Sequence, residues 1–283
     1  MQLRVAAVSF LNTWPLIAGL ADEPGVSVVT TLPSALPQLL EDDAADVALL
    51  PVFAYLAGTG AALVPGAGIG ARGPVDSVKL FARRPPRGLE TILVDRGSRT
   101  SVALLDVLLR EQWGATPTLR SGRPRPGEID DHEGILAIGD VCFAVDRATR
   151  TASAHRWRTH DLGDLWFATT GLPFVFAAWT LGQGFVARST AAERARLADL
   201  LAAARARGTA DIDALAGRAL AAGKCGVGGD ASRDAICYYL RNSLHFDLGP
   251  DEFQGIRYFR GLCARHGLLD AARPLTVLGP GGD

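Results

Sequence analysis

The residues best suited to chemistry in this 283-residue chain lie in four short segments, each where a strand is predicted to meet a helix or a turn. The segments are Ser9–Leu16 (SFLNTWPL), Gly73–Phe81 (GPVDSVKLF), Asp95–Ser101 (DRGSRTS) and Leu136–Asp140 (LAIGD). Their polar side chains are hydroxyls, amides, carboxylates and cations, which can bind a small anion, orient it and assist proton transfer. They predict a binding site for a small carboxylate.

In the first segment, Ser9 and Asn12 follow a strand expected over residues 3–8. The carboxyl ends of parallel strands face ligand sites, so both side chains can point at a ligand. The alternative is that Asn12 or Thr13 only caps a short helix expected over 15–20, because helix N-caps favour these residue types. The spacing leaves both interpretations open.

The Asp95–Ser101 segment leads into a helix expected over 100–110. A helix start offers free N–H groups and partial positive charge, which suit a carboxylate or a phosphate. Neither Ser98 nor Thr100 is followed by Glu or Gln three residues later, so there is no capping box. Arg99 is unfavourable at this end of the helix dipole unless an anion is bound. These features favour an anion site that includes Ser101 over simple capping.

Ser77 and Asp140 each have two interpretations. Strand alternation places Ser77 on one face of an extended run together with Lys79, and a lone Ser in a strand usually has a structural role. Gly139 and Asp140 follow a strand expected over 135–138. Asp140 either caps the next helix or faces the ligand.

Several common site motifs are missing from the sequence. There is no P-loop and no G-x-S-x-G elbow, and the glycines of 66–70 lack the spacing of a dinucleotide fingerprint. The four cysteines form no CxxC pair, which is typical of free thiols in a reducing compartment. No metal-ligand spacing links the histidines, which are His132, His155, His160, His245 and His266. The sequence therefore predicts no metal and no cofactor.

Composition indicates a globular protein without a polyanionic partner. Hydrophobic residues make up 48% of the chain, and the formal net charge is -1, so nothing favours binding to nucleic acid or to an anionic membrane. The N-terminus lacks the pattern of a secretory signal, and no run of about 18 apolar residues is present. We expect a cytoplasmic protein, and the oligomeric state is left open.

The elements that must position these residues alternate between strand and helix, which predicts an α/β fold. Strands are expected at 3–8, 26–30, 47–50, 91–94 and 135–138. Helices are expected at 15–20, 36–41, 100–110, near 140–145, and in a C-terminal series at 191–207, 211–221, 232–241 and 250–266. The βαβ order implies sheets with a parallel core.

Two extended runs, 75–83 and 174–186, flank the second alternation. They predict a two-lobed protein similar to type II periplasmic binding proteins, with a ligand cleft between the lobes. Lobe one comprises 1–82 plus 178–283, lobe two comprises 83–177, and the chain crosses near 80–86 and 174–180. The alternative is two unrelated sequential α/β domains.

Five segments together resemble the chorismate dehydratase family of the futalosine route to menaquinone. They are SFLNTWPL, GPVDSVKLF, DRGSRTSVALL, AIGD and DLGDLWFATTGLPFVFAAW, in order within about residues 3–186. The sister enzyme, dihydroxynaphthoate synthase, shares the two-lobed fold but has a first loop that reads like SPCPNDTF.

The resemblance implies a carbon–oxygen lyase that eliminates water from chorismate to give 3-enolpyruvylbenzoate. A proton leaves the ring carbon bearing the enolpyruvyl ether, and hydroxide leaves the neighbouring carbon. Aromatisation drives the reaction, so neither a metal nor a redox cofactor is required. The protein must orient a flexible dianion, assist proton removal and help hydroxide depart.

The resemblance also carries an active-site Asn onto Asn12 and an active-site Ser onto Ser77. The Ser98–Ser101 helix start suits one substrate carboxylate, and Ser9, Gly139 and Asp140 complete the predicted binding set. The base is either Asp140 or a substrate carboxylate that Asn12 and Ser77 orient, and the second is favoured. The functional alternatives are a non-catalytic binding protein for a small carboxylate and dihydroxynaphthoate synthase.

Overall fold

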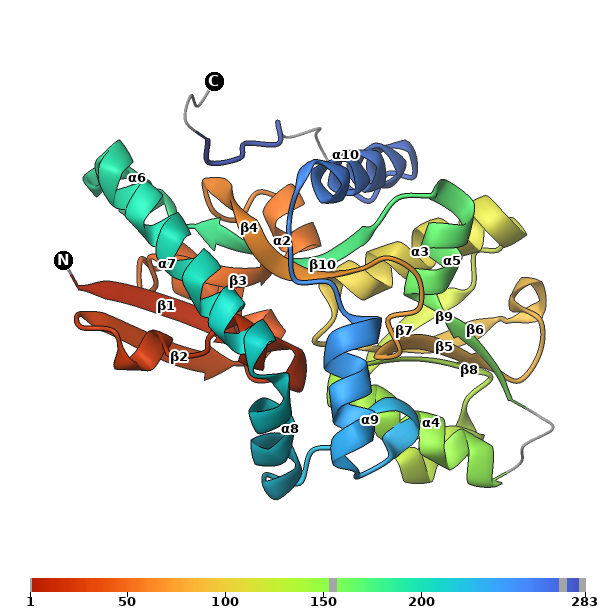
Figure 1. Ribbon diagram of the computed structural model, residues 1–283. Helices are drawn as coiled ribbons and strands as arrows, with labels where there is room; N and C mark the ends of the chain where they lie inside the picture. The colour runs from red at the N-terminus through yellow and green to blue at the C-terminus, as the bar shows by residue number, and fades with distance from the viewer. Residues whose placement is uncertain (1, 153–156, 270–273, 280–283) are drawn as a thin grey trace. The chain divides into compact units, whose positions relative to one another are not determined.

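The computed structural model describes residues 2–152, 157–269 and 274–279, so His155 lies outside the described residues. The chain divides into two compact units (Figure 1). Unit 1 comprises Met1–Gly70, Val175–Leu215 and His245–Asp283, and unit 2 comprises Ala71–Phe174 and Ala216–Leu244. Because the two units interleave along the chain, the alternative of two sequential domains is wrong.

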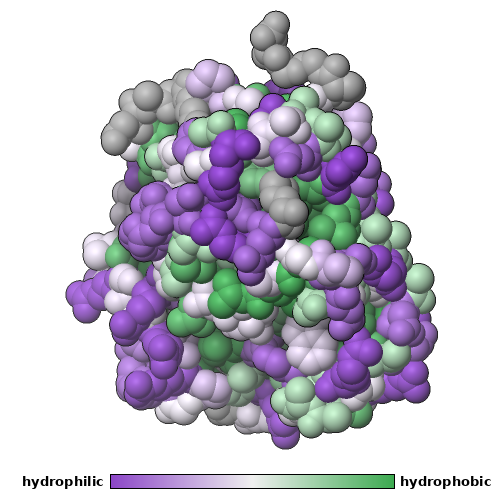
Figure 2. Space-filling view, turned by 90° about the vertical axis from the view of Figure 1, so that its left-hand side faces the viewer, coloured by the Kyte–Doolittle hydropathy of each residue, from purple (hydrophilic) through white to green (hydrophobic). Residues whose placement is uncertain are grey.

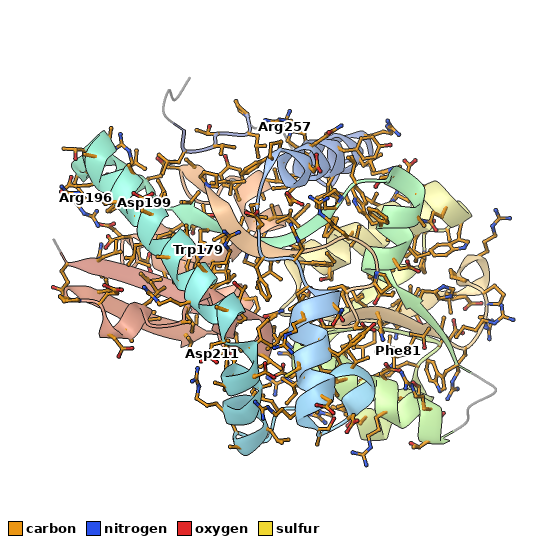
Figure 3. All side chains as sticks on the ribbon, viewed as in Figure 1. Phe81, Trp179, Arg196, Asp199, Asp211 and Arg257 are labelled. Carbon is orange, nitrogen blue, oxygen red and sulfur yellow. The ribbon has the colours of Figure 1, made fainter. Side chains whose placement is uncertain are left out.

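Unit 1 is built on a five-stranded mixed sheet with the order β2-β1-β3-β10-β4. The strands are β1 (Leu3–Val8), β2 (Val26–Thr31), β3 (Val47–Pro51), β4 (Ala62–Ala71) and β10 (Phe174–Leu181). β1 runs parallel to β2 and β3, and β10 pairs antiparallel with β3, with Trp179 opposite Leu49. Trp179, which is labelled on the ribbon in Figure 3, is fully buried and anchors this core.

Unit 1 also contains short helices and two longer ones. They are the 3₁₀ helices η1 (Leu11–Leu16), η2 (Leu20–Asp22) and η3 (Pro33–Ala35), and the α-helices α1 (Leu36–Glu41), α2 (Val52–Leu56), α6 (Gln183–Arg188), α7 (Ala191–Ala210) and α10 (Pro250–Arg265). A capping box at Thr190 and Glu193 begins α7. The far end of α7 packs closely on η1, since a Cβ on Gly208 would lie 2.1 Å from the Pro15 carbonyl oxygen.

Unit 2 repeats the strand arrangement of unit 1 in a second five-stranded sheet, with the order β7-β6-β8-β5-β9. The strands are β5 (Val78–Ala82), β6 (Thr91–Asp95), β7 (Thr118–Gly122), β8 (Gly134–Ile138) and β9 (Arg158–Asp161). β6 runs parallel to β7 and β8, and β5 pairs antiparallel with β8 and β9. Each unit therefore has a parallel core extended by an antiparallel strand.

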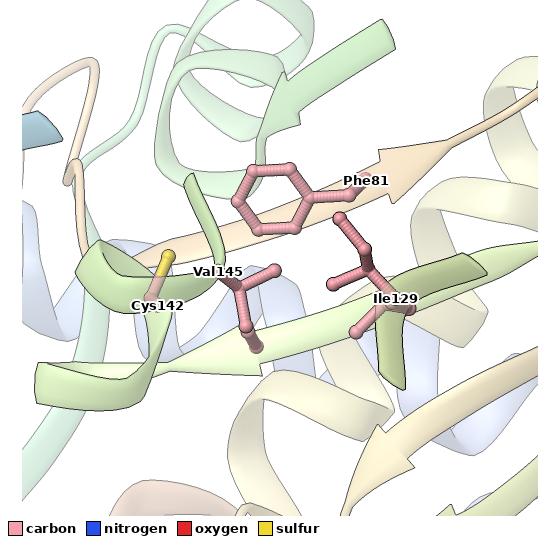
Figure 4. Packing of buried hydrophobic residues seen from close by; sticks show 6 residues of the cluster. Phe81, Ile129, Cys142 and Val145 are labelled. Atoms are coloured by element: carbon pink, nitrogen blue, oxygen red, sulfur yellow. The ribbon is translucent and has the colours of Figure 1, made fainter. Parts of the chain in front are cut away.

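Unit 2 also contains helices and helical turns, some of which contact this sheet. They are α3 (Arg99–Trp113), α4 (Gly139–Ala152), α5 (Leu162–Thr170), α9 (Arg233–Tyr238), the π-helical turn η7 (Tyr239–Ser243), and the 3₁₀ turns η4 (Pro86–Gly88), η5 (Pro126–Asp131) and η6 (Val227–Gly229); α8 (Ile212–Ala221) spans the boundary between the units in the sequence. Figure 4 shows Phe81 of β5 packed with Ile129, Cys142 and Val145.

The observed units differ from the predicted lobes at residues 71–82 and 216–244. Both segments were assigned to lobe one, whereas in the structure they belong to unit 2. Residues 71–82 belong to unit 2 because they include β5, which lies between β8 and β9 in the sheet of that unit. Residues 175–177, assigned to lobe two, belong to unit 1, and the chain crosses between units near 70, 174, 215 and 244. The predicted ligand cleft stays a prediction.

Two further local predictions need correction. The helix expected over 15–20 is instead the 3₁₀ helix Leu11–Leu16, and the helix expected over 232–241 divides into α9 and the π-helical turn. The glycine-rich strand β4 was not among the strands expected from the sequence. Glycine is required there because a Cβ on Gly68 would lie 2.4 Å from the Leu248 side chain, and the Gly68 N–H donates to the Phe246 carbonyl oxygen.

The surface carries both polar and apolar residues. On the face drawn in Figure 2, hydrophilic residues (purple) occupy much of the surface and hydrophobic ones (green) appear between them. Large exposed hydrophobic side chains come from separate elements, such as Val29 in β2 and Tyr258 in α10. Within the described ranges, no helix combines the length and the apolar character needed to cross a bilayer.

Candidate functional site

Ser77 lies at the end of an unusual backbone turn in unit 2. The Ser77 N–H donates to the Val75 carbonyl oxygen at 2.7 Å, which closes a three-residue γ-turn centred on Asp76. Asp76 has φ +60, a left-handed conformation that non-glycine residues rarely adopt. Such a conformation costs about 1–3 kcal/mol and persists only where surrounding contacts hold it, often at functional sites.

The carboxylate of Asp161 holds this turn from β9. Its Oδ1 accepts from the Val75 N–H at 3.0 Å, and its Oδ2 accepts from the Asp76 N–H at 2.7 Å. The same Oδ1 caps α5 by accepting from the N–H groups of Gly163 and Asp164. Burial raises the pKa of Asp161, while these N–H donors oppose the rise. One side chain therefore fixes both the turn and the start of a helix.

A buried ionic network contacts the side chain of Asp76 in this turn. Asp76 Oδ1 lies 3.2 Å from Lys79 Nζ, and Lys79 Nζ lies 3.1 Å from Asp146 Oδ2. Burial alone would lower the pKa of Lys79, but the attraction of Asp146 and Asp76 outweighs it and raises that pKa. Asp76 Oδ2 accepts a hydrogen bond from Ser243 Oγ at 2.7 Å. The Asp76 carboxylate is thus engaged on both oxygens.

The Ser77 hydroxyl is only 1% exposed and has a defined partner. The Tyr239 hydroxyl donates to Ser77 Oγ at 2.9 Å, and the Gly139 N–H donates to the Ser77 carbonyl oxygen at 2.7 Å. Gly139 has φ +55, so a residue that tolerates the left-handed region suits the start of α4. The Cys142 thiol donates to the Asp76 carbonyl oxygen at 3.7 Å, and burial raises its pKa well above the usual value, which keeps it neutral.

Ser77, Gly139 and Ser98 lie at one edge of the unit 2 sheet. β6 and β8 run parallel, so the segments that follow them start at the same edge. β5 is antiparallel to β8, and Val78 pairs with Ile138, which places the start of β5 at this edge too. Three of the four segments singled out in the sequence are therefore grouped by strand direction alone.

The helix α3 begins with three buried hydroxyl side chains and no acidic residue in its first turn. Ser98 is the N-cap, but its side chain makes no capping hydrogen bond, so the simple capping interpretation is not supported. Ser98, Thr100 and Ser101 are buried, whereas Arg99 is exposed. The arrangement can bind an anion through hydroxyl and N–H groups.

Asp140, in the first turn of α4, forms an ion pair with Lys224. Their Oδ2 and Nζ atoms are 2.5 Å apart, and both side chains are 27% exposed. The sequence predicted Asp140 either as a cap or as a ligand-facing group, and it did not predict this partner. The carboxylate is accessible but is already engaged by an ammonium group.

Ser9 and Asn12 belong to unit 1, where they follow β1. Ser9 is exposed, and its N–H donates to the Thr31 carbonyl oxygen at 3.0 Å. The N-cap of η1 is Phe10, so neither Asn12 nor Thr13 caps the helix, and that interpretation was wrong. Asn12 Oδ1 is buried without a hydrogen-bond partner among the described residues. An unsatisfied buried oxygen costs about 1–3 kcal/mol, so it is suited to accept a hydrogen bond from a ligand.

Sequence reasoning missed Asp161, Lys79, Asp146, Tyr239 and Ser243 as parts of this site. Asp161 precedes LGDLW and reads as a helix cap, but nothing in the sequence connects it with Val75 and Asp76. Tyr239 and Ser243 lie in a π-helical turn more than 160 positions beyond Ser77, and no local pattern signals that contact. Within residues 2–152, 157–269 and 274–279, no three His, Cys, Asp or Glu side chains gather in a group that could hold a metal ion.

Solved structures show the same fold as this chain. The periplasmic aliphatic sulphonate binding protein SsuA from Escherichia coli is 15% identical with a TM-score of 0.60, over 95% of this chain and 89% of that one. The alkanesulfonate-binding protein SsuA from Xanthomonas axonopodis is 16% identical with a TM-score of 0.62, over 96% and 95%. A protein from Archaeoglobus fulgidus is 12% identical with a TM-score of 0.67, over 94% and 98%. The predicted periplasmic-binding-protein-like α/β fold is confirmed.

One curated relative is the protein named chorismate dehydratase from Thermus thermophilus. It is 31% identical over 166 residues, which cover 55% of this chain. The match spans 61% of the relative, which is less than two thirds of its length. A family model described as menaquinone biosynthesis matches residues 3–265, almost the whole chain. The resemblance noted in the sequence is thus confirmed, and the chain belongs to the menaquinone biosynthesis family.

Proposed function

We propose that this protein is a chorismate dehydratase, which eliminates water from chorismate to give 3-[(1-carboxyvinyl)oxy]benzoate. The family match and the name of the Thermus thermophilus relative support a dehydratase with a role in menaquinone biosynthesis. The observation that carries the proposal is the Ser77 hydroxyl, buried on a strained turn at the sheet edge from which the hydroxyl-rich start of α3 also emerges.

The reaction depends more on the orientation of the substrate than on a strong catalytic acid or base. The C–H bond of the ring carbon that bears the ether breaks, its electron pair becomes part of the ring, and the C–O bond to the neighbouring hydroxyl breaks. The removed proton and the departing hydroxide together form one molecule of water. Aromatisation makes the process strongly downhill, so the protein's contribution is to orient groups that interact in the transition state.

In this proposal, the Ser77 hydroxyl donates a hydrogen bond to the departing oxygen. One substrate carboxylate binds at the start of α3, where Ser98, Thr100 and Ser101 supply hydroxyls and the helix dipole supplies positive potential. Arg99, exposed beside them, adds a cation. Asn12 in unit 1 uses its unsatisfied amide oxygen to orient the substrate.

The proton is removed by a carboxylate of the substrate rather than by Asp140. The observation that favours this choice is the ion pair of Asp140 with Lys224, which directs the Asp140 carboxylate to an ammonium group. Gly139 acts indirectly, because its N–H holds the Ser77 carbonyl oxygen. Ser9 is the exposed polar residue nearest along the chain to Asn12, and we retain it as a substrate contact.

The fold supports a second candidate, a non-catalytic binding protein for a small carboxylate, because the two SsuA proteins share it. Dihydroxynaphthoate synthase remains the alternative within menaquinone biosynthesis. Incubating the purified protein with chorismate and following an aromatic product by absorbance and chromatography separates these functions. An aromatic product with the mass of chorismate less one water supports the proposal. Binding of chorismate without any product refutes it.

Ser77→Ala tests the assigned site. We expect the turnover number to fall by roughly ten- to a thousandfold with little change in KM, since a hydrogen bond formed mainly in the transition state is lost. Ser121→Ala is the matched control, because Ser121 is an exposed serine in β7 of the same sheet. Wild-type turnover by a folded Ser77→Ala variant would remove Ser77 from the mechanism.

A further inference from the structure

We propose that Tyr239 is a positioning residue that sets the direction in which the Ser77 hydroxyl donates. The inference rests on the proposed function, because it assumes that Ser77 contacts the departing oxygen. Its starting observation is the 2.9 Å hydrogen bond from the Tyr239 hydroxyl to Ser77 Oγ, between two side chains that are each 1% exposed.

The Tyr239 ring is fixed by packing that is independent of its hydroxyl. Its centroid lies 4.9 Å from that of Phe143 in an edge-to-face contact, with an interplanar angle of 87°. Phe143 belongs to α4, which Gly139 begins, and the Gly139 N–H holds the Ser77 carbonyl oxygen. The phenol and the serine backbone are thus held by the same helix.

The backbone that carries Tyr239 is itself unusual. Tyr239–Ser243 form a π-helical turn, a feature that is rare and often occurs at functional sites. Its first residue bonds the Ser77 side chain, and its last residue, Ser243, donates to the Asp76 carboxylate at 2.7 Å. The π-helical turn therefore makes two adjacent contacts with the strained γ-turn, one to each of its last two residues.

The order of donors follows from hydroxyl chemistry. A phenol is a stronger acid than an alcohol, so Tyr239 donates and Ser77 Oγ accepts. With a lone pair of Ser77 occupied in this way, the serine O–H is directed to a second acceptor, and the chain of two hydrogen bonds strengthens its donation. The departing oxygen of the substrate is that acceptor. No net proton transfer along the chain is required, because the substrate's own abstracted proton completes the water.

Tyr239→Phe is the test, since it removes the hydroxyl and keeps the ring against Phe143. We expect the turnover number to fall by about five- to fiftyfold, the range of one or two hydrogen-bond contributions, while KM and the melting temperature change little. Tyr238→Phe is the matched control, because Tyr238 is adjacent in sequence and 55% exposed. It should keep wild-type turnover.

A double-variant cycle distinguishes action through Ser77 from a general structural role. In the Ser77→Ala background, Tyr239→Phe should cause no further loss of turnover, because the hydroxyl it acts on is already gone. A further loss of the same size in that background would overturn the inference. So would wild-type turnover by Tyr239→Phe in a protein whose Ser77→Ala variant is impaired.

These outcomes are separable from failure of the proposed function. If the unmodified protein makes no aromatic product from chorismate, the dehydratase proposal fails and the inference fails with it. If the unmodified protein is active and Ser77→Ala is impaired, the dehydratase proposal stands. The turnover of Tyr239→Phe then tests the role of Tyr239 separately from the proposed function.

Discussion

Asp161→Asn isolates one hydrogen bond that holds the strained turn. In the structure, Oδ1 of Asp161 accepts from three N–H groups, those of Val75, Gly163 and Asp164, while Oδ2 accepts from the Asp76 N–H. An Asn amide oxygen can keep the three bonds at the Oδ1 position. Its NH₂ group then faces the Asp76 N–H, and two donors meet where a donor and an acceptor met before.

The expected cost comes from the lost hydrogen bond. A donor left unsatisfied in a mostly buried place costs about 1–3 kcal/mol. Loss of the negative charge adds nothing to this cost, because burial raises the pKa of Asp161 and already disfavours its charged form in the folded state. We therefore expect the free energy of unfolding to fall by about 1–3 kcal/mol. The Asp76–Ser77 turn is released at the same time, so turnover should fall at least about tenfold even under conditions where the variant is fully folded.

Denaturant unfolding and chorismate turnover measure the two effects on the same preparations. Asp164→Asn is the control, because Asp164 is exposed in the first turn of the same helix and its substitution removes the same charge. It should cost at most about 1 kcal/mol and leave turnover unchanged. If Asp161→Asn matches Asp164→Asn in both measurements, the carboxylate does not hold the turn and the reasoning is refuted.

Two further predictions concern packing and pH. Gly208→Ala should lower the free energy of unfolding by at least about 1–3 kcal/mol, because its Cβ would lie 2.1 Å from the Pro15 carbonyl oxygen. Gly217→Ala should raise the free energy of unfolding by about 0.5–1 kcal/mol, because Gly217 is exposed in α8 and its Cβ would have nothing within 4 Å. Equal melting temperatures for the two variants would contradict both expectations. Burial, aided by Arg158, lowers the pKa of His160 below 6.5, so the folded state binds this proton less readily than the unfolded chain. The stability contributed by neutral His160 should therefore be fully present above pH 6.5 and be lost as the pH drops through the lowered pKa. The melting temperature of His160→Gln should depend less on pH in that range. The same dependence of melting temperature on pH in the variant and the unmodified protein would show that His160 is not responsible.

Strand direction explains how much of the candidate site could be predicted from the sequence. The alternation of apolar strands and helices predicted strands over 3–8, 91–94 and 135–138, and all three are confirmed to within a residue. Segments that follow parallel strands must share a sheet edge, so Ser98 and Gly139 could be placed together without coordinates. Local hydrophobic periodicity is sufficient to predict these strands because the pattern involves residues only a few positions apart.

The boundaries of the units could not be predicted, because they depend on contacts between distant segments. Residues 216–244 have the same helical pattern as the rest of the C-terminal region. Long-range contacts associate them with unit 2, such as those of Tyr239 with Ser77 and of Lys224 with Asp140. The glycine-rich β4 was missed for a similar reason. Its Gly68 is required by the close approach of Leu248, which lies 180 positions away.

The sequence by itself determined the family, the α/β class and the polar groups that follow the strand ends, since these depend on residue type and short-range spacing. Only the tertiary structure decided that Asp76 adopts a left-handed conformation and that Asp161 and Tyr239 hold the adjacent Ser77 turn. A strained backbone is stable only where several distant side chains satisfy it together. That sum of long-range contacts has no signature in any one stretch of sequence.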